Sequence, residues 1–168
     1  MSRVVYGLAL ALALLSARQA AAAPVKVAVA NFDFADTSGE VENQTAAHAS
    51  RIKGLEDALA AAINRTGRFT AATITCATPP CSVGNLDAGS LTEAGKKAGA
   101  AFIIFGGVHK ISTLITFGRV ELVNLATGRS VMNRDITFRG DDQDAWQHAD
   151  SYIGDMVTQA LNGIPAEK

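Results

Sequence analysis

Cysteine, histidine and aromatic residues are scarce in this chain of 168 residues, which contains two Cys, three His and only 6% aromatic residues. Two cysteines and three dispersed histidines offer no recognisable metal-ligand spacing, and the H-E-x-x-H motif of zinc proteases is absent. The G-x-S-x-G nucleophile elbow and the glycine-rich phosphate loop are absent as well. We therefore expect neither enzymatic activity nor a bound cofactor or metal.

Basic tracts are also missing, and long hydrophobic runs are confined to the first residues. The chain has 15 basic and 16 acidic residues, and without Arg3 and Arg18 the basic residues fall to 13. A mildly acidic chain with no basic tract is a poor partner for nucleic acid. No apolar stretch after residue 22 is long enough to cross a bilayer, so we expect no membrane span once the leader is removed.

The first 22 residues have the pattern of a secretory signal peptide. Arg3 gives a positive start, Leu8 to Leu15 form an apolar segment, and Ala20 to Ala23 provide small residues for cleavage. We expect residues 1–22 to be removed and residues 23–168 to form a single mixed α/β domain in the bacterial periplasm. An uncleaved amino-terminal anchor is the alternative interpretation.

The only two cysteines, Cys76 and Cys81, lie close together in the sequence T-C-A-T-P-P-C-S. Export to an oxidising compartment favours a structural disulfide between them. Two other interpretations remain. A redox-active pair usually has two intervening residues whereas this pair has four, and a zinc site needs more ligands than two thiolates.

The apolar run Phe102–Phe105 is the segment around which the other elements are arranged. It is too short for a core helix and combines β-branched with aromatic side chains, which is typical of a strand covered on both faces of a sheet. After it, Thr116–Leu122 alternates polar and apolar residues, and Met132, Ile136 and Phe138 share one parity beyond the turn at Gly128. We expect a central strand followed by an antiparallel hairpin with one wet face.

Further strands and helices are predicted on either side of this core. Alternating valines predict a first strand, and polar and turn-forming residues predict a long loop after it; a stripe of Ile and Leu predicts a first helix that stops at Gly67. A weaker strand precedes the cysteines, a capping box begins a short second helix, and two aspartates precede a last helix. These segments are Val25–Phe34, Asp33–Thr45, Ala46–Gly67, Phe69–Thr75, Ser90–Gly99 and Asp141–Gly163.

The predicted order of elements is β-α-β-α-β-β-β-α. A βαβαβ start implies right-handed crossovers and parallel strands, and the terminal meander adds antiparallel ones. The fold class is therefore α/β with α+β character, built on a mixed β-sheet of about five strands in two or three layers.

Several of these segments together resemble a known group of proteins. They are V-A-V-A-N-F-D-F-A-D-T-S in the first strand, G-A-A-F-I-I-F-G-G-V-H-K-I-S in the central strand, and L-A-T-G-R and F-R-G-D-D-x-D-A-W near the end. With the exported start, they look like an uncharacterised family of bacterial secreted proteins, which is itself similar to the TolB amino-terminal domain and to CsgG-type periplasmic α/β domains. The resemblance implies a TolB-like fold and carries no established activity.

One group of polar residues is predicted to form a crevice. Ligands in α/β sheets bind beyond the carboxyl ends of parallel strands, and strands one and three bring their ends together if they are neighbours. Carboxylates, hydroxyls and cations would then suit a small anionic ligand or a metal, and the alternative is a solvated loop whose polar residues form turns. The candidates are Asp33, Asp36, Thr37, Ser38, His48, Arg51, His109 and Lys110.

Two other groups are candidates for contacts. The acidic run at Asp141, Asp142 and Asp144 lacks the pattern of a calcium loop, so helix capping is the preferred interpretation. Arg119 and Glu121 share the outer face of the hairpin and are candidates for a partner surface. Trp146 is a candidate hot spot for the same partner, and the alternative is a core position within the apolar stripe of the last helix.

The absence of catalytic motifs and the exported α/β pattern favour one function over another. We expect a non-enzymatic accessory or adaptor domain that binds another cell-envelope protein, through an exposed sheet edge or the outer face of the hairpin. The alternative is a periplasmic small-molecule or metal-binding protein that uses the predicted crevice.

Overall fold

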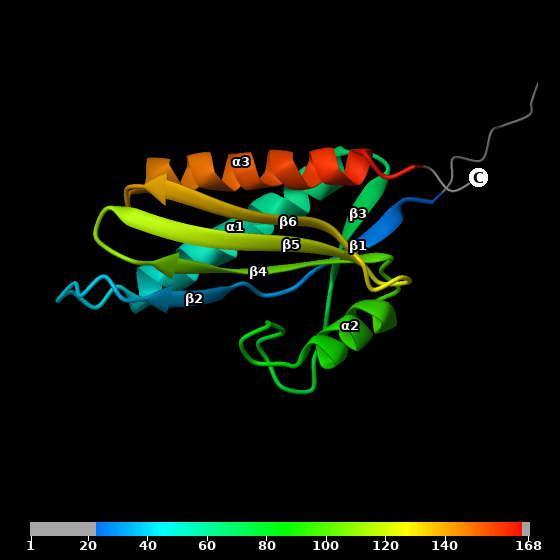
Figure 1. Ribbon diagram of the computed structural model, residues 1–168, viewed down its shortest axis with the longest axis horizontal. Coiled ribbons are helices and arrows are strands. Elements are labelled where there is room, and N and C mark those ends of the chain that lie inside the picture. Colours follow the sequence, from blue (N-terminus) through cyan, green and yellow to red (C-terminus); the bar gives the residue numbers. More distant parts are fainter. Residues whose placement is uncertain (1–22, 166–168) are drawn as a thin grey trace, which may run out of the picture.

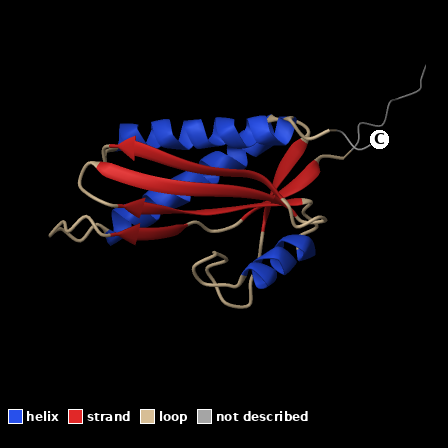
Figure 2. Cartoon of the chain, in the orientation of Figure 1, coloured by secondary structure: helices blue, strands red, loops and turns tan. Residues whose placement is uncertain are grey.

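A mixed β-sheet separates two long helices from one short helix (Figures 1 and 2). The structure is a computed structural model and describes residues 23–165. The elements follow in the order β1 (Val25–Val29), β2 (Asp33–Asp36), α1 (Thr45–Arg65), β3 (Phe69–Thr73), α2 (Ala88–Lys97), β4 (Phe102–Lys110), β5 (Ile115–Asn124), β6 (Ser130–Arg139) and α3 (Gln143–Asn162). The leader expected in residues 1–22 lies outside the described residues.

The sheet has six strands, and five of them run in the order β3-β1-β4-β5-β6. β1 is parallel to both β3 and β4, whereas β4, β5 and β6 form an antiparallel meander. The sheet is therefore mixed, as the sequence predicts. Strands β3 and β6 end the five-strand path, and β2 pairs with β4 alone. Among the described helices, none combines the length and apolar character needed to cross a membrane.

The central strand β4 is covered on both faces. Phe102 and Ile104 belong to the larger core, which α1 and α3 cover. Ile103, between them, turns to the opposite face and packs in a smaller core with Leu91 and Ala94 of α2. The two cores make three layers, and the prediction that Phe102–Phe105 lies in the middle of the sheet is confirmed.

The first strand differs from its prediction, because the chain forms two strands where one was expected. β1 ends at Val29 and β2 begins at Asp33, and both lie parallel beside β4. Glu56 of α1 occupies the break between them, where its carboxylate accepts a hydrogen bond from the backbone amide of Phe32 at 2.9 Å. β2 coincides with the start of the predicted loop. A loop is predicted there because the two aspartates of β2 are typical of turns.

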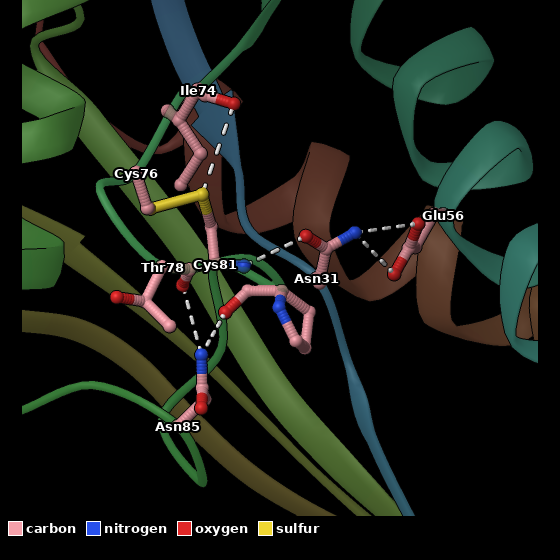
Figure 3. Close-up of a disulfide and its surroundings, with 8 residues drawn as sticks. Asn31, Glu56, Ile74, Cys76, Thr78, Cys81 and Asn85 are labelled. Atoms are coloured by element: carbon pink, nitrogen blue, oxygen red, sulfur yellow. Dashed lines mark hydrogen bonds between the residues drawn. A yellow bond between two sulfur atoms is a disulfide. The ribbon is translucent and has the colours of Figure 1, made fainter.

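The disulfide between Cys76 and Cys81 is present and lies beside this break (Figure 3). Asn31 joins the two, because its carbonyl oxygen accepts a hydrogen bond from the Cys81 amide at 3.0 Å and its amide nitrogen donates to Glu56 at 3.3 Å. The disulfide loop is therefore anchored to α1 through a single asparagine.

The N-cap of α3 agrees with the sequence prediction, whereas the N-cap of α2 differs from it. Asp142 caps α3 as expected, accepting a hydrogen bond from the Ala145 amide at 2.8 Å. The predicted capping box at Ser90 is wrong, because α2 begins three residues earlier and Asp87 is its N-cap. The Ser90 amide donates to the Asp87 carboxylate at 2.9 Å, so Ser90 lies inside the first turn.

Candidate functional site

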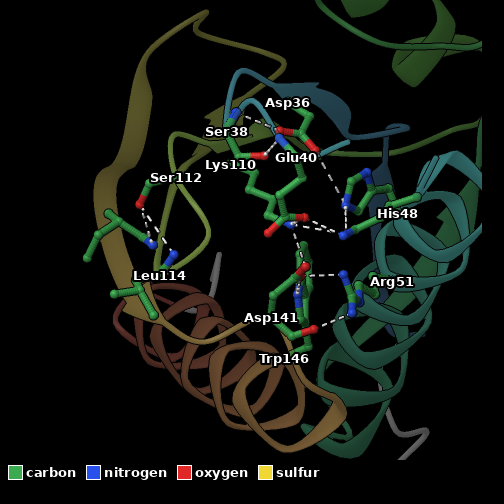
Figure 4. Close-up of polar contacts among 12 residues, drawn as sticks. Asp36, Ser38, Glu40, His48, Arg51, Lys110, Ser112, Leu114, Asp141 and Trp146 are labelled. Carbon is green, nitrogen blue, oxygen red and sulfur yellow. Dashed lines mark hydrogen bonds and ion pairs between the residues drawn. The ribbon is translucent and has the colours of Figure 1, made fainter. Parts of the chain in front are cut away.

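Lys110, the last residue of β4, has its ammonium group buried among polar side chains (Figure 4). Its side chain is only 1% exposed. The Nζ atom donates hydrogen bonds to Glu40 at 2.6 Å, to Gln44 at 3.0 Å and to Asp141 at 2.6 Å. Three donor hydrogens therefore meet three acceptors, so the buried charge is fully hydrogen-bonded.

Asp141 connects this ammonium group to a second cation. Arg51 of α1 donates hydrogen bonds to the carboxylate and to the backbone carbonyl of Asp141. The indole of Trp146 donates to the same carboxylate at 3.3 Å, and the Arg51 guanidinium lies 5.8 Å from the centre of the indole ring. We refer to Glu40, Gln44, Arg51, Lys110 and Asp141 as the Lys110 cluster.

His48 lies next to the cluster on α1. Its ring stacks on Phe34 with 4.3 Å between ring centres, and its Nε2 atom lies 3.1 Å from the Gln44 side-chain oxygen. The Asp36 carboxylate is 3.7 Å away. Burial lowers the pKa of His48 in spite of this carboxylate, so the ring is neutral at pH 7.

The cluster holds its own charges in their ionised forms. Burial would lower the pKa of Lys110, but the hydrogen bonds to Asp141 and Glu40 outweigh burial and raise it. Burial would raise the pKa of Asp141, yet the hydrogen bonds from Lys110 and Trp146 and the charge of Arg51 lower it. Each ion is therefore stabilised by its neighbours and needs no external counter-ion.

The structure divides the predicted crevice residues between the two faces of the sheet. Side chains alternate between the two faces along a strand. Asp36 and Lys110 lie opposite each other in the register and turn toward α1, whereas Asp33 and His109 turn toward the other face. Asp33 accepts hydrogen bonds from the Ser82 hydroxyl at 2.6 Å and from the Gly84 amide at 2.8 Å, and so contacts the segment that directly follows the disulfide.

The remaining crevice candidates, Thr37, Ser38 and His109, lie outside the Lys110 cluster. His109 and Thr37 are joined by a hydrogen bond of 2.8 Å in an exposed position. Ser38 makes local turn contacts, since its amide donates to Asp36 at 2.8 Å. Of the eight candidates, the structure gathers Asp36, His48, Arg51 and Lys110 around one centre.

Glu40, Gln44 and Asp141 complete the cluster and were missed by sequence reasoning. One feature of the sequence could have indicated that such partners exist, namely the position of Lys110 in the alternation of β4. It shares the core-facing positions of β4 with Phe102, Ile104 and Val108, and a lysine on an apolar strand face requires carboxylates to stabilise its charge. The sequence does not reveal which carboxylates these are.

The geometry gives the cluster little capacity for an external ligand. Within residues 23–165, no group of three His, Cys, Asp or Glu side chains is arranged to hold a metal ion. Hollows of about 410, 340 and 300 Å³ lie elsewhere on the surface, and none of the three is lined by a predicted crevice residue. The cluster ties the end of β4 to the amino-terminal ends of α1 and α3.

The structure shows where the candidate partner-surface residues lie, and their role in binding a partner stays a prediction. Arg119 and Glu121 share the outer face of the hairpin, where Arg119 donates two hydrogen bonds to Asp135 at 2.6 and 2.9 Å. Trp146 is not on this surface, because its ring is 3% exposed and packs edge-on against Phe138 at 5.3 Å. The core interpretation of this tryptophan is therefore correct.

Comparison with solved structures places this fold among TolB-like α/β domains. TolB from Acinetobacter baumannii is 18% identical, with a TM-score of 0.51 over 86% of this chain, which spans only 30% of the TolB chain. The PelC dodecamer from Paraburkholderia phytofirmans is 14% identical, with a TM-score of 0.54 over 84% of this chain and 90% of the PelC chain. No curated protein matches the sequence significantly.

The family model DUF3280, described as "Protein of unknown function (DUF2380)", matches residues 25–156. The chain therefore belongs to this family of unknown function. The resemblance to an uncharacterised family with a TolB-like fold is confirmed by these matches.

Proposed function

We propose that this chain is a non-enzymatic adaptor domain of the bacterial periplasm that binds another cell-envelope protein through a free edge of its sheet or the outer face of the hairpin. The observation that carries the proposal is the unpaired edge of β6. This terminal strand is ten residues long and, among the described strands, pairs only with β5. An edge strand presents unpaired N–H and C=O groups to which a strand of another protein can be added.

The other terminal strand is less suited to this role. β3 has five residues, and side chains of the preceding segment already satisfy part of its backbone. The Phe69 amide donates to the Thr66 hydroxyl at 3.1 Å, and the Ala71 amide donates to the Asn64 side chain at 2.8 Å. β2, which pairs only with β4, has four residues. Of the described strands with one unpaired side, β6 is the longest and therefore the best template for strand addition.

The Lys110 cluster supports a binding domain rather than an enzyme or a ligand carrier. A catalytic acid or base needs a pKa near the working pH, whereas the hydrogen bonds within the cluster raise the pKa of Lys110 and lower that of Asp141. The similar PelC protein forms a dodecamer, which is an example of a protein of this fold in contact with other chains. The periplasmic address is proposed from the signal-peptide pattern of residues 1–22.

Site-specific photo-crosslinking in intact cells tests the proposal. A photoreactive amino acid is placed at Thr137 on β6, at Glu121 on the hairpin face or, as a control, at the exposed Lys97 on α2. We expect one envelope protein to be captured from Thr137 or Glu121 and not from Lys97, with mass spectrometry identifying the captured chain. Equal background from all three positions would contradict the proposal.

Thermal denaturation separates this function from the alternative. A protein that binds a small molecule or metal in the crevice gains stability when its ligand is added, by mass action. We expect no increase in melting temperature across a panel of metabolites and divalent metals. A reproducible increase that is lost in His48→Ala would support the alternative instead.

A further inference from the structure

Strand β6 and helix α3 lie side by side (Figure 1), and the surface between them is hollowed at two places. The two hollows measure about 340 Å³ at the start of β6 and about 300 Å³ at its end. Both are lined by β6 on one side and by α3 on the other. We refer to them together as the β6 groove.

Apolar side chains provide part of the lining of the groove. Val131 on β6 lines the first hollow and is 38% exposed, and Tyr152 on α3 lines the second and is 58% exposed. Met156 and Ala160 lie between the two layers and pack against the core from the side of the groove. An extended chain beside β6 would turn every second side chain toward these residues.

Positively charged side chains also line the groove. Arg134 lines the first hollow, Arg139 and His148 line the second, and no carboxylate lines either hollow. Within residues 23–165, Arg134 and Arg139 form no ion pair, unlike Arg119, whose guanidinium is matched to Asp135. The groove therefore combines an unpaired strand edge, apolar hollows and unmatched cations.

We propose that the β6 groove binds an extended segment of a partner protein in which acidic and apolar residues alternate, and that this segment pairs with β6 as a seventh strand. The inference rests on the proposed adaptor function and names its binding surface. Backbone hydrogen bonds would supply affinity, and alternate apolar side chains would fill the two hollows on the α3 side of the sheet. Arg139 belongs to the opposite face of β6, so the carboxylates between the apolar residues would meet Arg139, whereas Arg134 on the α3 side would add a longer-range attraction.

A second copy of this chain is a poorer occupant. An antiparallel pair of β6 strands centred on Arg134 or on Arg139 would place that arginine opposite the same residue of the other copy, and like charges directly opposite each other are destabilising. An acidic segment reverses the sign of this interaction. The charge of the edge therefore selects a partner of different sequence.

A synthetic peptide tests the inference on protein purified after expression of the full chain. The probe is a fluorescein-labelled ten-residue peptide of alternating valine and glutamate, and fluorescence anisotropy measures its binding. One control peptide has lysine in place of glutamate, and another is N-methylated at every second amide, which removes the strand hydrogen bonds. We expect both controls to bind at least about tenfold more weakly than the probe.

Charge reversal of the protein distinguishes a specific groove from general attraction. The variant R134E/R139E should bind the valine–glutamate peptide about tenfold more weakly and should bind the valine–lysine peptide better than the unmodified protein does. A matched variant, R65E/K97E, changes the net charge equally at exposed positions outside the groove and should bind like the unmodified protein. Because a swap of preference cannot result from unfolding, it isolates the groove.

The outcomes separate this inference from the proposed function. If the peptides bind equally, or if R134E/R139E behaves like R65E/K97E, the β6 groove is not the site, even when crosslinking in cells still captures a partner. If the purified chain dimerises and protects β6 amides from hydrogen exchange without peptide, a second copy occupies the groove and the inference is wrong. Selective peptide binding without a captured envelope protein would support the groove and contradict the adaptor function.

Discussion

Lys110 carries its charge on a side chain that is almost completely buried. Its ammonium group is buried and depends on Glu40 and Asp141, whose side chains are 22% and 17% exposed. Removal of the Lys110 charge would leave Glu40 and Asp141 close together, largely shielded from solvent and with only Arg51 to balance them, which is more costly than loss of a surface pair. The three residues therefore act as a single structural unit.

The variant Lys110→Met tests this unit. We expect it to lower the free energy of unfolding by about 3 kcal/mol, because Glu40 then loses its cation and only Arg51 remains to balance Asp141. Lys96→Met is the matched control, since Lys96 pairs with Glu93 on the surface and its loss should cost less than about 1 kcal/mol. Urea denaturation measures both. Equal small losses would show that the Lys110 cluster contributes little to folding.

Asp150 is a partly buried carboxyl group that forms no ion pair with another described residue. Its Oδ1 atom is buried without a hydrogen-bond partner within residues 23–165, and Oδ2 lies near Gly54 of α1. Burial raises the pKa of Asp150 from 3.8 to about 6. The folded protein therefore holds this proton more tightly than the unfolded chain does.

The sign of the resulting pH dependence follows from linkage. This carboxyl group destabilises the fold progressively as the pH rises from about 4 to 6, and the penalty is constant above that range. Asp150→Asn should therefore stabilise the protein at pH 7.5 by about 1–2 kcal/mol, a figure reduced for partial solvent exposure, and should have little effect at pH 4. Denaturation at both pH values measures this, with the exposed Asp155→Asn as control. A pH-independent difference would contradict the account.

At the scale of elements, the pairing of β4 with β5 depends on one glycine. A Cβ atom at Gly106 would lie 2.1 Å from the backbone oxygen of Arg119 and 2.7 Å from the ring of Phe32. The backbone of β5 cannot retreat without loss of the ladder. The sequence shows this position only as a change of character after Phe102–Phe105, and the close approach itself comes from the tertiary structure.

The neighbouring glycine provides a matched control. Gly106→Ala should reduce the free energy of unfolding by about 3 kcal/mol, because the added methyl group overpacks the strand pair. A Cβ atom at Gly107 would have its nearest neighbour at 3.5 Å, an ordinary contact, so Gly107→Ala should cost less than about 1 kcal/mol. Urea denaturation compares the two variants. A larger effect at Gly107 would refute the packing argument.

The elements with strong periodicity could be predicted from the sequence, and those made by tertiary contacts could not. The buried stripe of α1 and the wet face of the hairpin follow from spacing, and both are confirmed. β2 was not predicted as a separate strand because it begins and ends with aspartates, Asp33 and Asp36, whose strand conformation depends on pairing with β4. The cap of α2 was misassigned because Asp87 and Ser90 both suit an N-cap, and only the backbone distinguishes them.

The candidate site could be predicted in part. The topological rule led to Lys110, Arg51 and His48, because parallel strands do end at one edge. It could not predict that Asp33 turns to the other face, since that depends on where β2 begins. Nor could it predict that Asp141, 31 residues beyond Lys110 in the chain, completes the cluster.

At the scale of the whole molecule, the end of β4 is tied to two helices, whereas the long edge strand β6 is unpaired on one side. The Lys110 cluster ties the end of β4 to α1 and α3, and the disulfide loop covers the break between β1 and β2 through Asn31. β6 carries an unpaired edge with unmatched arginines beside it. This distribution favours a partner at the edge over a ligand at the end of β4.

Photo-crosslinking from Thr137 in living cells is the measurement that tests this account most directly, because Thr137 lies on β6 beside the groove. The account predicts that light yields one dominant adduct with a different envelope protein, and that the same residue placed at Lys97 yields none. Capture of the same proteins from both positions, or of nothing, would contradict the claim that this molecule works through the free edge of its sheet.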